Sequence, residues 1–152
     1  MYYGVQYYPE HWPEERWAID AKMMQEAGVN VVRMGEFAWS YFEPKEGVQD
    51  FSKYDEAIAL LYEHGIRTIM CTCSRTVPPW LLTKFPGILT SDRNGNLKSP
   101  GHRYLVGMAH EDFIRESQRI DRAVIEHFAG NPAIEAWQID NCLLYTSDAA
   151  DE

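Results

Sequence analysis

Apolar segments rich in β-branched residues alternate with amphipathic segments of helical period, and this order restricts the fold more than any other feature of the chain. The predicted strands cover residues 4–8, 29–34, 66–72 and 134–140. The predicted long helices cover residues 13–27, 51–64 and 111–128. Apolar strands that are separated by helices pair in parallel, because each helix carries the chain back across the sheet. The sequence therefore predicts an α/β fold.

The residues after the first predicted strand separate two α/β architectures. A doubly wound nucleotide-binding fold needs a glycine-rich turn there, but this chain has PEHWP at positions 9–13. A (β/α)8 barrel instead collects polar and aromatic side chains where its strands end. Such residues lie at or just after the carboxyl ends of all four predicted strands: Tyr7, Tyr8, His11, Trp12, Arg33, Glu36, Thr72, Arg75, Trp80, Asp140 and Asn141. We therefore expect the first four βα units of a TIM barrel, truncated relative to the eight strands and about 250 residues of a complete one.

Charge and cysteine content narrow the functional classes. The 152 residues include 14 basic and 23 acidic side chains, giving a net charge of −9, which argues against nucleic acid or an anionic membrane surface as a partner. No apolar run approaches the ~18 residues of a membrane span, and the N-terminus lacks the basic region of a secretory signal. Three cysteines are too few for a disulfide scaffold. We therefore expect a cytoplasmic protein.

Three shorter signals predict local structure. Residues 78–82 have the prolines of a short helical turn, and Asn94-Gly95 is typical of a hairpin. Ser52 is a candidate N-cap for the second long helix.

Three stretches carry a family resemblance. They are GVQYYPEHWPEERW at 4–17, AGVNVVRMGEFAWSYFEPKEG at 27–47 and AWQIDN at 136–141. Over about residues 1–141 the chain resembles the N-terminal half of the catalytic barrel of glycoside hydrolase family 42 β-galactosidases. The resemblance implies a retaining hydrolase of terminal β-D-galactosides, with no cofactor and a parent enzyme that is a homo-oligomer, often a trimer.

The same resemblance indicates what happens at the catalytic position. The family motif continues Trp-Gln-Ile-Asp-Asn-Glu, and its Glu is the general acid/base, whereas Cys142 follows Asn141 here. Retaining hydrolysis needs two carboxyl groups about 5–5.5 Å apart, and the family takes the second from strand seven. A thiol differs from a carboxylic acid in pKa and geometry. We therefore expect the chain as it stands to be inactive.

The resemblance also implies a set of substrate-binding residues: Asn141, Arg103, Arg33 and Glu36. Asn141 would contact the hydroxyl beside the reacting carbon, or it would only end its strand. Arg33 would lie near the galactose pocket, and an ion pair with Glu36 is compatible with that role. Arg103 would contact substrate, and Glu36 would either orient Arg33 or bind the sugar.

Residues 142–152 have neither helical period nor likeness to the family. Their sequence, CLLYTSDAADE, is similar to a translated transposase-type sequencing adapter. The sequence therefore predicts that residues 1–141 are the N-terminal half of the barrel domain and that residues 142–152 are a non-native tail.

Three alternatives stay open. Cys71 and Cys73 share one strand face and could begin a metal site, but no further ligand lies near in sequence, so buried free thiols and no metal are expected. His11, Trp12 and Trp80 could stack on a sugar or fill the barrel end. The alternative function is that of a non-catalytic half-barrel that binds sugar or associates with itself.

Overall fold

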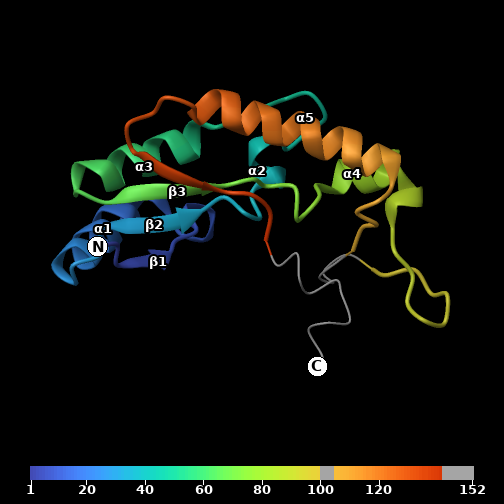
Figure 1. Ribbon diagram of the computed structural model, residues 1–152, viewed down its shortest axis with the longest axis horizontal. Coiled ribbons are helices and arrows are strands. Elements are labelled where there is room, and N and C mark those ends of the chain that lie inside the picture. The colour runs from blue at the N-terminus through green and yellow to red at the C-terminus, as the bar shows by residue number, and fades with distance from the viewer. Residues whose placement is uncertain (100–104, 142–152) are drawn as a thin grey trace.

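A parallel sheet of four strands forms the centre of the computed structural model, which describes residues 1–99 and 105–141 (Figure 1). The strands are β1 (Gly4–Gln6), β2 (Val31–Met34), β3 (Arg67–Cys71) and β4 (Ile134–Gln138). They lie side by side in sequence order, and every pair is parallel. This arrangement confirms the α/β prediction.

Helices connect successive strands. They are α1 (Glu14–Glu26), α2 (Trp39–Phe42), α3 (Ser52–Glu63), α4 (Pro79–Lys84) and α5 (Glu111–Phe128). Single 3-10 turns cover Pro9–His11 and Pro86–Ile88. The three long helices agree with the predicted ones to within one or two residues. The four-residue α2 was not predicted, because it is too short to show a helical period.

One core lies between the sheet and the long helices. In Figure 1, α3 and α5 run together over one face of the sheet. Trp17 of α1, Ile58 of α3 and Val124 of α5 belong to the same buried cluster as Val32 and Met34 of β2. Because side chains alternate along a strand, Arg33 between those two β2 residues lies on the opposite face, which is the interior side of a barrel.

Two predicted strands, β1 and β4, end two residues earlier in the structure than the sequence suggested. β1 ends at Gln6 because Pro9 begins a 3-10 turn, although Tyr7 N still donates to Arg33 O at 3.0 Å. β4 ends at Gln138 because Asp140 has a φ of +57°, which is not an extended conformation.

The shorter signals had mixed outcomes. The predicted Asn94-Gly95 turn is confirmed, since Ser91 and Leu97 form an antiparallel bridge around it. The prediction that Ser52 caps α3 is wrong. Asp50 Oδ1 instead accepts hydrogen bonds from Ser52 N at 3.0 Å and from Ser52 Oγ at 2.6 Å. The Asp50 carboxylate therefore accepts the hydrogen bond of a backbone N–H group at the start of α3, which has no partner within the helix.

Candidate functional site

Arg33 forms the centre of a polar network at the carboxyl edge of the sheet. Its Nη2 donates to Glu36 Oε1 at 2.6 Å, and its Nη1 donates to Gln138 Oε1 at 2.8 Å. The guanidinium of this β2 residue therefore joins Glu36, which follows β2, to Gln138 of β4, although β2 and β4 are not neighbours in the sheet. The ion pair between Arg33 and Glu36 that the sequence suggested is confirmed.

Glu36 is a buried carboxylate on which several donors converge. Its side chain has no exposed surface, and Oε1 also accepts a hydrogen bond from Tyr8 Oη at 2.7 Å. Burial and this hydrogen bond raise the pKa of Tyr8 to about 12. Burial and the charge of Glu36 raise the pKa of the Cys71 thiol to about 12. Both neighbours therefore stay protonated at neutral pH and can donate to the carboxylate.

Gly35 allows Glu36 to occupy this position. Its φ is +97°, and a Cβ at this residue would lie 2.9 Å from Met70 Cε and 3.3 Å from Cys71 O. A larger residue would be strained by its backbone and would also press on β3.

A second set of bonds fixes the turn after β4. Gln138 Nε2 donates to Asp140 O at 2.9 Å, and Asp140 N donates to Thr72 Oγ1 at 2.8 Å. Asp140 adopts the left-handed conformation, which aspartate tolerates better than most residues. This turn leads directly into Asn141, the predicted sugar-binding amide.

The structure brings Arg33 and Glu36 together and places Asn141 after β4 at the same edge of the sheet. Arg103 and Cys142 lie outside the described residues. Sequence reasoning did not assign Gln138 to the site. Its separation of two residues from Asp140 could have indicated a shared strand face.

A second buried carboxylate, Glu43, holds the segment after β2 against α5. Glu43 Oε2 accepts from Arg119 Nη2 at 2.8 Å and from Trp39 Nε1 at 3.1 Å, and Oε1 accepts from Gly47 N at 2.8 Å. Trp80 Nε1 donates to Glu43 O at 3.0 Å, and the Trp80 ring packs edge-on against Trp39. These contacts favour a packing role for Trp80 over sugar stacking.

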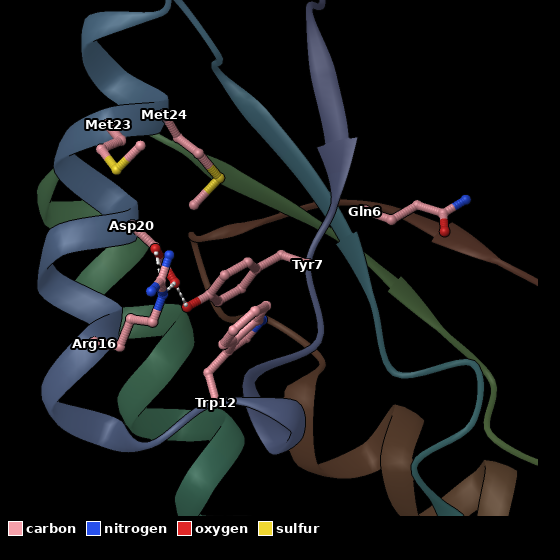
Figure 2. Close-up of a pocket in the computed structure, with 7 residues that line it drawn as sticks. All are labelled: Gln6, Tyr7, Trp12, Arg16, Asp20, Met23 and Met24. Carbon is pink, nitrogen blue, oxygen red and sulfur yellow. Dashed lines mark hydrogen bonds and ion pairs between the residues drawn. The ribbon is translucent and has the colours of Figure 1, made fainter.

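A pocket of about 270 Å³ lies between β1 and α1, and Figure 2 shows its lining. Tyr7 Oη donates to Asp20 Oδ2 at 3.2 Å, and the Arg16 guanidinium lies 4.7 Å from the centre of the Trp12 ring. Gln6 points to the other side of β1 from Tyr7 (Figure 2). The lining includes neither Arg33 nor Glu36, so Trp12 belongs to a different surface from the polar network.

Cys71 and Cys73 are buried free thiols, as predicted. Within residues 1–99 and 105–141, no three His, Cys, Asp or Glu side chains come close enough together to hold a metal ion. No helix in those same ranges is long and apolar enough to cross a bilayer.

Burial of Cys73 predicts a loss of stability at alkaline pH. Desolvation raises its pKa well above the ordinary 9.0, and the nearby Asp121 charge adds to this. Above about pH 9 the unfolded chain loses this proton while the folded chain keeps it, so the contribution to stability is complete below pH 9 and declines as the pH rises. Each such group lowers the free energy of unfolding by at most about 1.4 kcal/mol per pH unit.

Urea unfolding of the chain between pH 7 and pH 10 checks this expectation. The Cys73→Ala variant should show a shallower decline above pH 9 than the unsubstituted chain, whatever its stability at pH 7. Equal slopes for the two proteins would contradict the expectation.

Comparison with known proteins gives consistent matches. Residues 6–150 match the family model Glyco_hydro_42, described as β-galactosidase. The β-galactosidase bgaB of Geobacillus kaustophilus is 42% identical over 139 residues, which are 91% of this chain and 21% of that protein. The crystal structure of a β-galactosidase from the psychrophilic Marinomonas ef1 superposes with a TM-score of 0.87 at 37% identity, covering 93% of this chain and 22% of that one.

A β-galactosidase from the Antarctic haloarchaeon Halorubrum lacusprofundi also superposes with a TM-score of 0.87, at 40% identity, covering 93% of this chain and 21% of that one. The chain therefore spans about a fifth of the length of these relatives. The four parallel strands correspond to part of the relatives' TIM barrel.

Proposed function

This chain belongs to glycoside hydrolase family 42, and from that membership we propose that it forms the N-terminal half of the catalytic barrel of a retaining β-galactosidase. The parent enzyme would hydrolyse terminal non-reducing β-D-galactosides. The observation that carries the proposal is the pair of hydrogen bonds from the Arg33 guanidinium to Glu36 and Gln138 at the carboxyl edge of the sheet. TIM-barrel enzymes place their active sites at this edge. The trimeric state of the parent and its cytoplasmic location stay predictions.

Each residue of the network has a proposed task. Arg33 lies 23% exposed at the mouth of the network, so it can donate to a sugar hydroxyl while it remains paired with Glu36. Glu36 has no exposed surface, so it orients Arg33 rather than contacting sugar. Asn141 donates to, or accepts from, the hydroxyl beside the reacting carbon. Arg103 is proposed as a further substrate contact on the resemblance alone.

Cys142 occupies the position where the family has its proton donor. A thiol gives up its proton to a leaving oxygen poorly, and the carboxylate nucleophile of strand seven comes from a part of the family barrel that this chain does not match. We therefore propose that the chain by itself does not hydrolyse galactosides.

A chimera tests the assignment. Residues 1–141 would replace the matching stretch of the Geobacillus kaustophilus enzyme, whose remaining sequence completes the barrel. We expect hydrolysis of p-nitrophenyl β-D-galactopyranoside by the chimera and no turnover above a vector-only control by the 152-residue chain. A folded chimera that cleaves other nitrophenyl glycosides but not the galactoside would contradict the substrate class. Turnover by the chain alone would contradict its inactivity.

Self-association of the chain is a second candidate, which the surface around the Figure 2 pocket favours. Trp12 and Met23 line this pocket and are 43% and 59% exposed, beside β1 at the edge of the described sheet. An exposed apolar patch along an edge strand is a common site of association.

Sedimentation velocity of the chain tests this candidate. We expect concentration-dependent association that Met23→Lys weakens and that Ile125→Lys, at an exposed position on α5, leaves unchanged. A chain that sediments as a monomer at every concentration would exclude the candidate.

A further inference from the structure

We propose that Gln138 is a positioning residue for the galactosidase reaction, because it joins the sugar-binding Arg33 to the turn that presents Asn141. This inference rests on the proposed function and assigns a task to a residue that neither the sequence pattern nor the resemblance singled out.

Both the oxygen and the nitrogen of the Gln138 side-chain amide form hydrogen bonds. Its oxygen accepts from Arg33 Nη1 at 2.8 Å, and its nitrogen donates to Asp140 O at 2.9 Å. One planar group therefore sets the distance between the guanidinium and the backbone of the turn. Among the natural side chains, only the shorter asparagine offers the same carboxamide oxygen and NH₂ group.

The turn is held from its other side as well. Asp140 N donates to Thr72 Oγ1 at 2.8 Å, and Thr72 N donates to Gln138 O at 3.0 Å. Gln138 is thus fixed to β3 by its backbone, so its side chain can impose a position on its two partners. A left-handed Asp140 needs such support, because its conformation is less favourable than an extended one.

The position of the turn sets where Asn141 lies relative to Arg33. Asn141 follows this turn directly. A small displacement of the turn would move Asn141 relative to Arg33, and misplacement by about 1 Å costs about 100-fold in rate. Hydrogen bonds to the sugar hydroxyl beside the reacting carbon strengthen in the transition state, so the loss should fall on kcat more than on KM.

Two substitutions in the chimera separate the two bonds. Gln138→Glu keeps an acceptor for Arg33 but loses the donor to Asp140 O, whereas Gln138→Leu loses both. Gln25→Glu is the matched control, because Gln25 Nε2 also donates to a backbone carbonyl, His64 O at 3.0 Å, on the surface of α1. Thermal unfolding of each variant shows whether it is folded at the assay temperature.

For Gln138→Glu we expect kcat to fall about 10- to 100-fold while KM changes less than threefold. For Gln138→Leu we expect kcat to fall and KM to rise, because Arg33 also loses a partner. Gln25→Glu should match the unsubstituted chimera. Folded Gln138 variants with unchanged kcat, or losses explained by the unfolded fraction, would overturn the inference.

Hydrogen exchange at the Asp140 amide, measured in the same proteins, does not depend on activity. We expect exchange at least 10-fold faster in Gln138→Glu than in Gln25→Glu, because the turn is less restrained. Equal exchange would overturn the inference even if the chimera is inactive. Inactivity of the unsubstituted chimera with the expected exchange pattern would count against the proposed function only.

Discussion

Replacement of Arg33 with methionine in the chimeric barrel should lower kcat/KM for the nitrophenyl galactoside on the order of 10³-fold. Arg33 donates to Glu36 and to Gln138 at once, and in the proposed site it also contacts the sugar. Methionine has similar length but no donor and no charge. The buried Glu36 carboxylate would then lose its cationic partner and be left with uncharged donors such as the Tyr8 hydroxyl, and a buried charge without an ion-pair partner is destabilising.

A lysine substitution at the same position distinguishes charge from geometry. The Arg33→Lys variant would keep a positive charge beside Glu36, but an ammonium group does not have the planar fork that reaches two acceptors on different strands. We expect this variant to recover part of the activity that Arg33→Met loses and to remain at least about 10-fold below the unsubstituted chimera.

Arg16 provides the control for these variants. It also pairs with a carboxylate, Asp20, but its side chain is 47% exposed on α1. Arg16→Met should leave kcat/KM within about twofold, since Arg16 bonds Asp20 and neither Glu36 nor Gln138 of the Arg33 network. If Arg33→Met retained the activity of Arg16→Met, the role assigned to Arg33 would be wrong.

Glu43→Gln should lower the free energy of unfolding of the chain by about 3 kcal/mol, because it removes the charged partner of a buried ion pair. Both carboxylate oxygens accept hydrogen bonds: Oε1 from Gly47 N, and Oε2 from Trp39 Nε1 and Arg119 Nη2. The glutamine NH₂ group must face one of these donors, so at least one buried donor loses its acceptor. Arg119 would also lose its bond to a carboxylate that has no exposed surface.

Glu46→Gln is the matched control three residues along the chain. Glu46 pairs with Lys84, and both side chains are at least 40% exposed, so this change should cost less than about 1 kcal/mol. Urea unfolding of the three proteins, followed by circular dichroism, gives the comparison. Equal midpoints for Glu43→Gln and Glu46→Gln would show that the Glu43 network does not stabilise the fold.

Local sequence determined the secondary structure and its order. The amphipathic period of α1, α3 and α5 and the glycines after them are sufficient to place these helices. β-branched runs between them place the strands, and helical crossovers make neighbouring strands parallel. The motif at 136–141 also pointed to the family that the comparisons show.

Side-chain partners distant in sequence were decided only by the tertiary structure. The sequence allows Trp80 either to stack on a sugar or to fill the barrel end, and in the structure its indole donates to Glu43 O, which favours a packing role. Trp12 follows the same strand as Tyr8, but it lines the pocket between β1 and α1 while Tyr8 bonds Glu36. Helical and strand periods carry no information about such contacts, because they describe one segment at a time.

The partner of Arg33 depends on an irregularity between β3 and β4. Thr68 pairs with Ile134 but Ile69 pairs with Ala136, so one residue of β4 is skipped and Cys71 pairs with Gln138. Without this shift, Trp137 would be level with Cys71, and the side chains of β4 would exchange faces from there on. The sequence alone determined that a polar residue ends β4. The register of the folded sheet decided that Gln138 faces Arg33. A one-residue slip in pairing changes little in the local strand pattern, but it moves every side chain beyond it to the opposite face of the sheet.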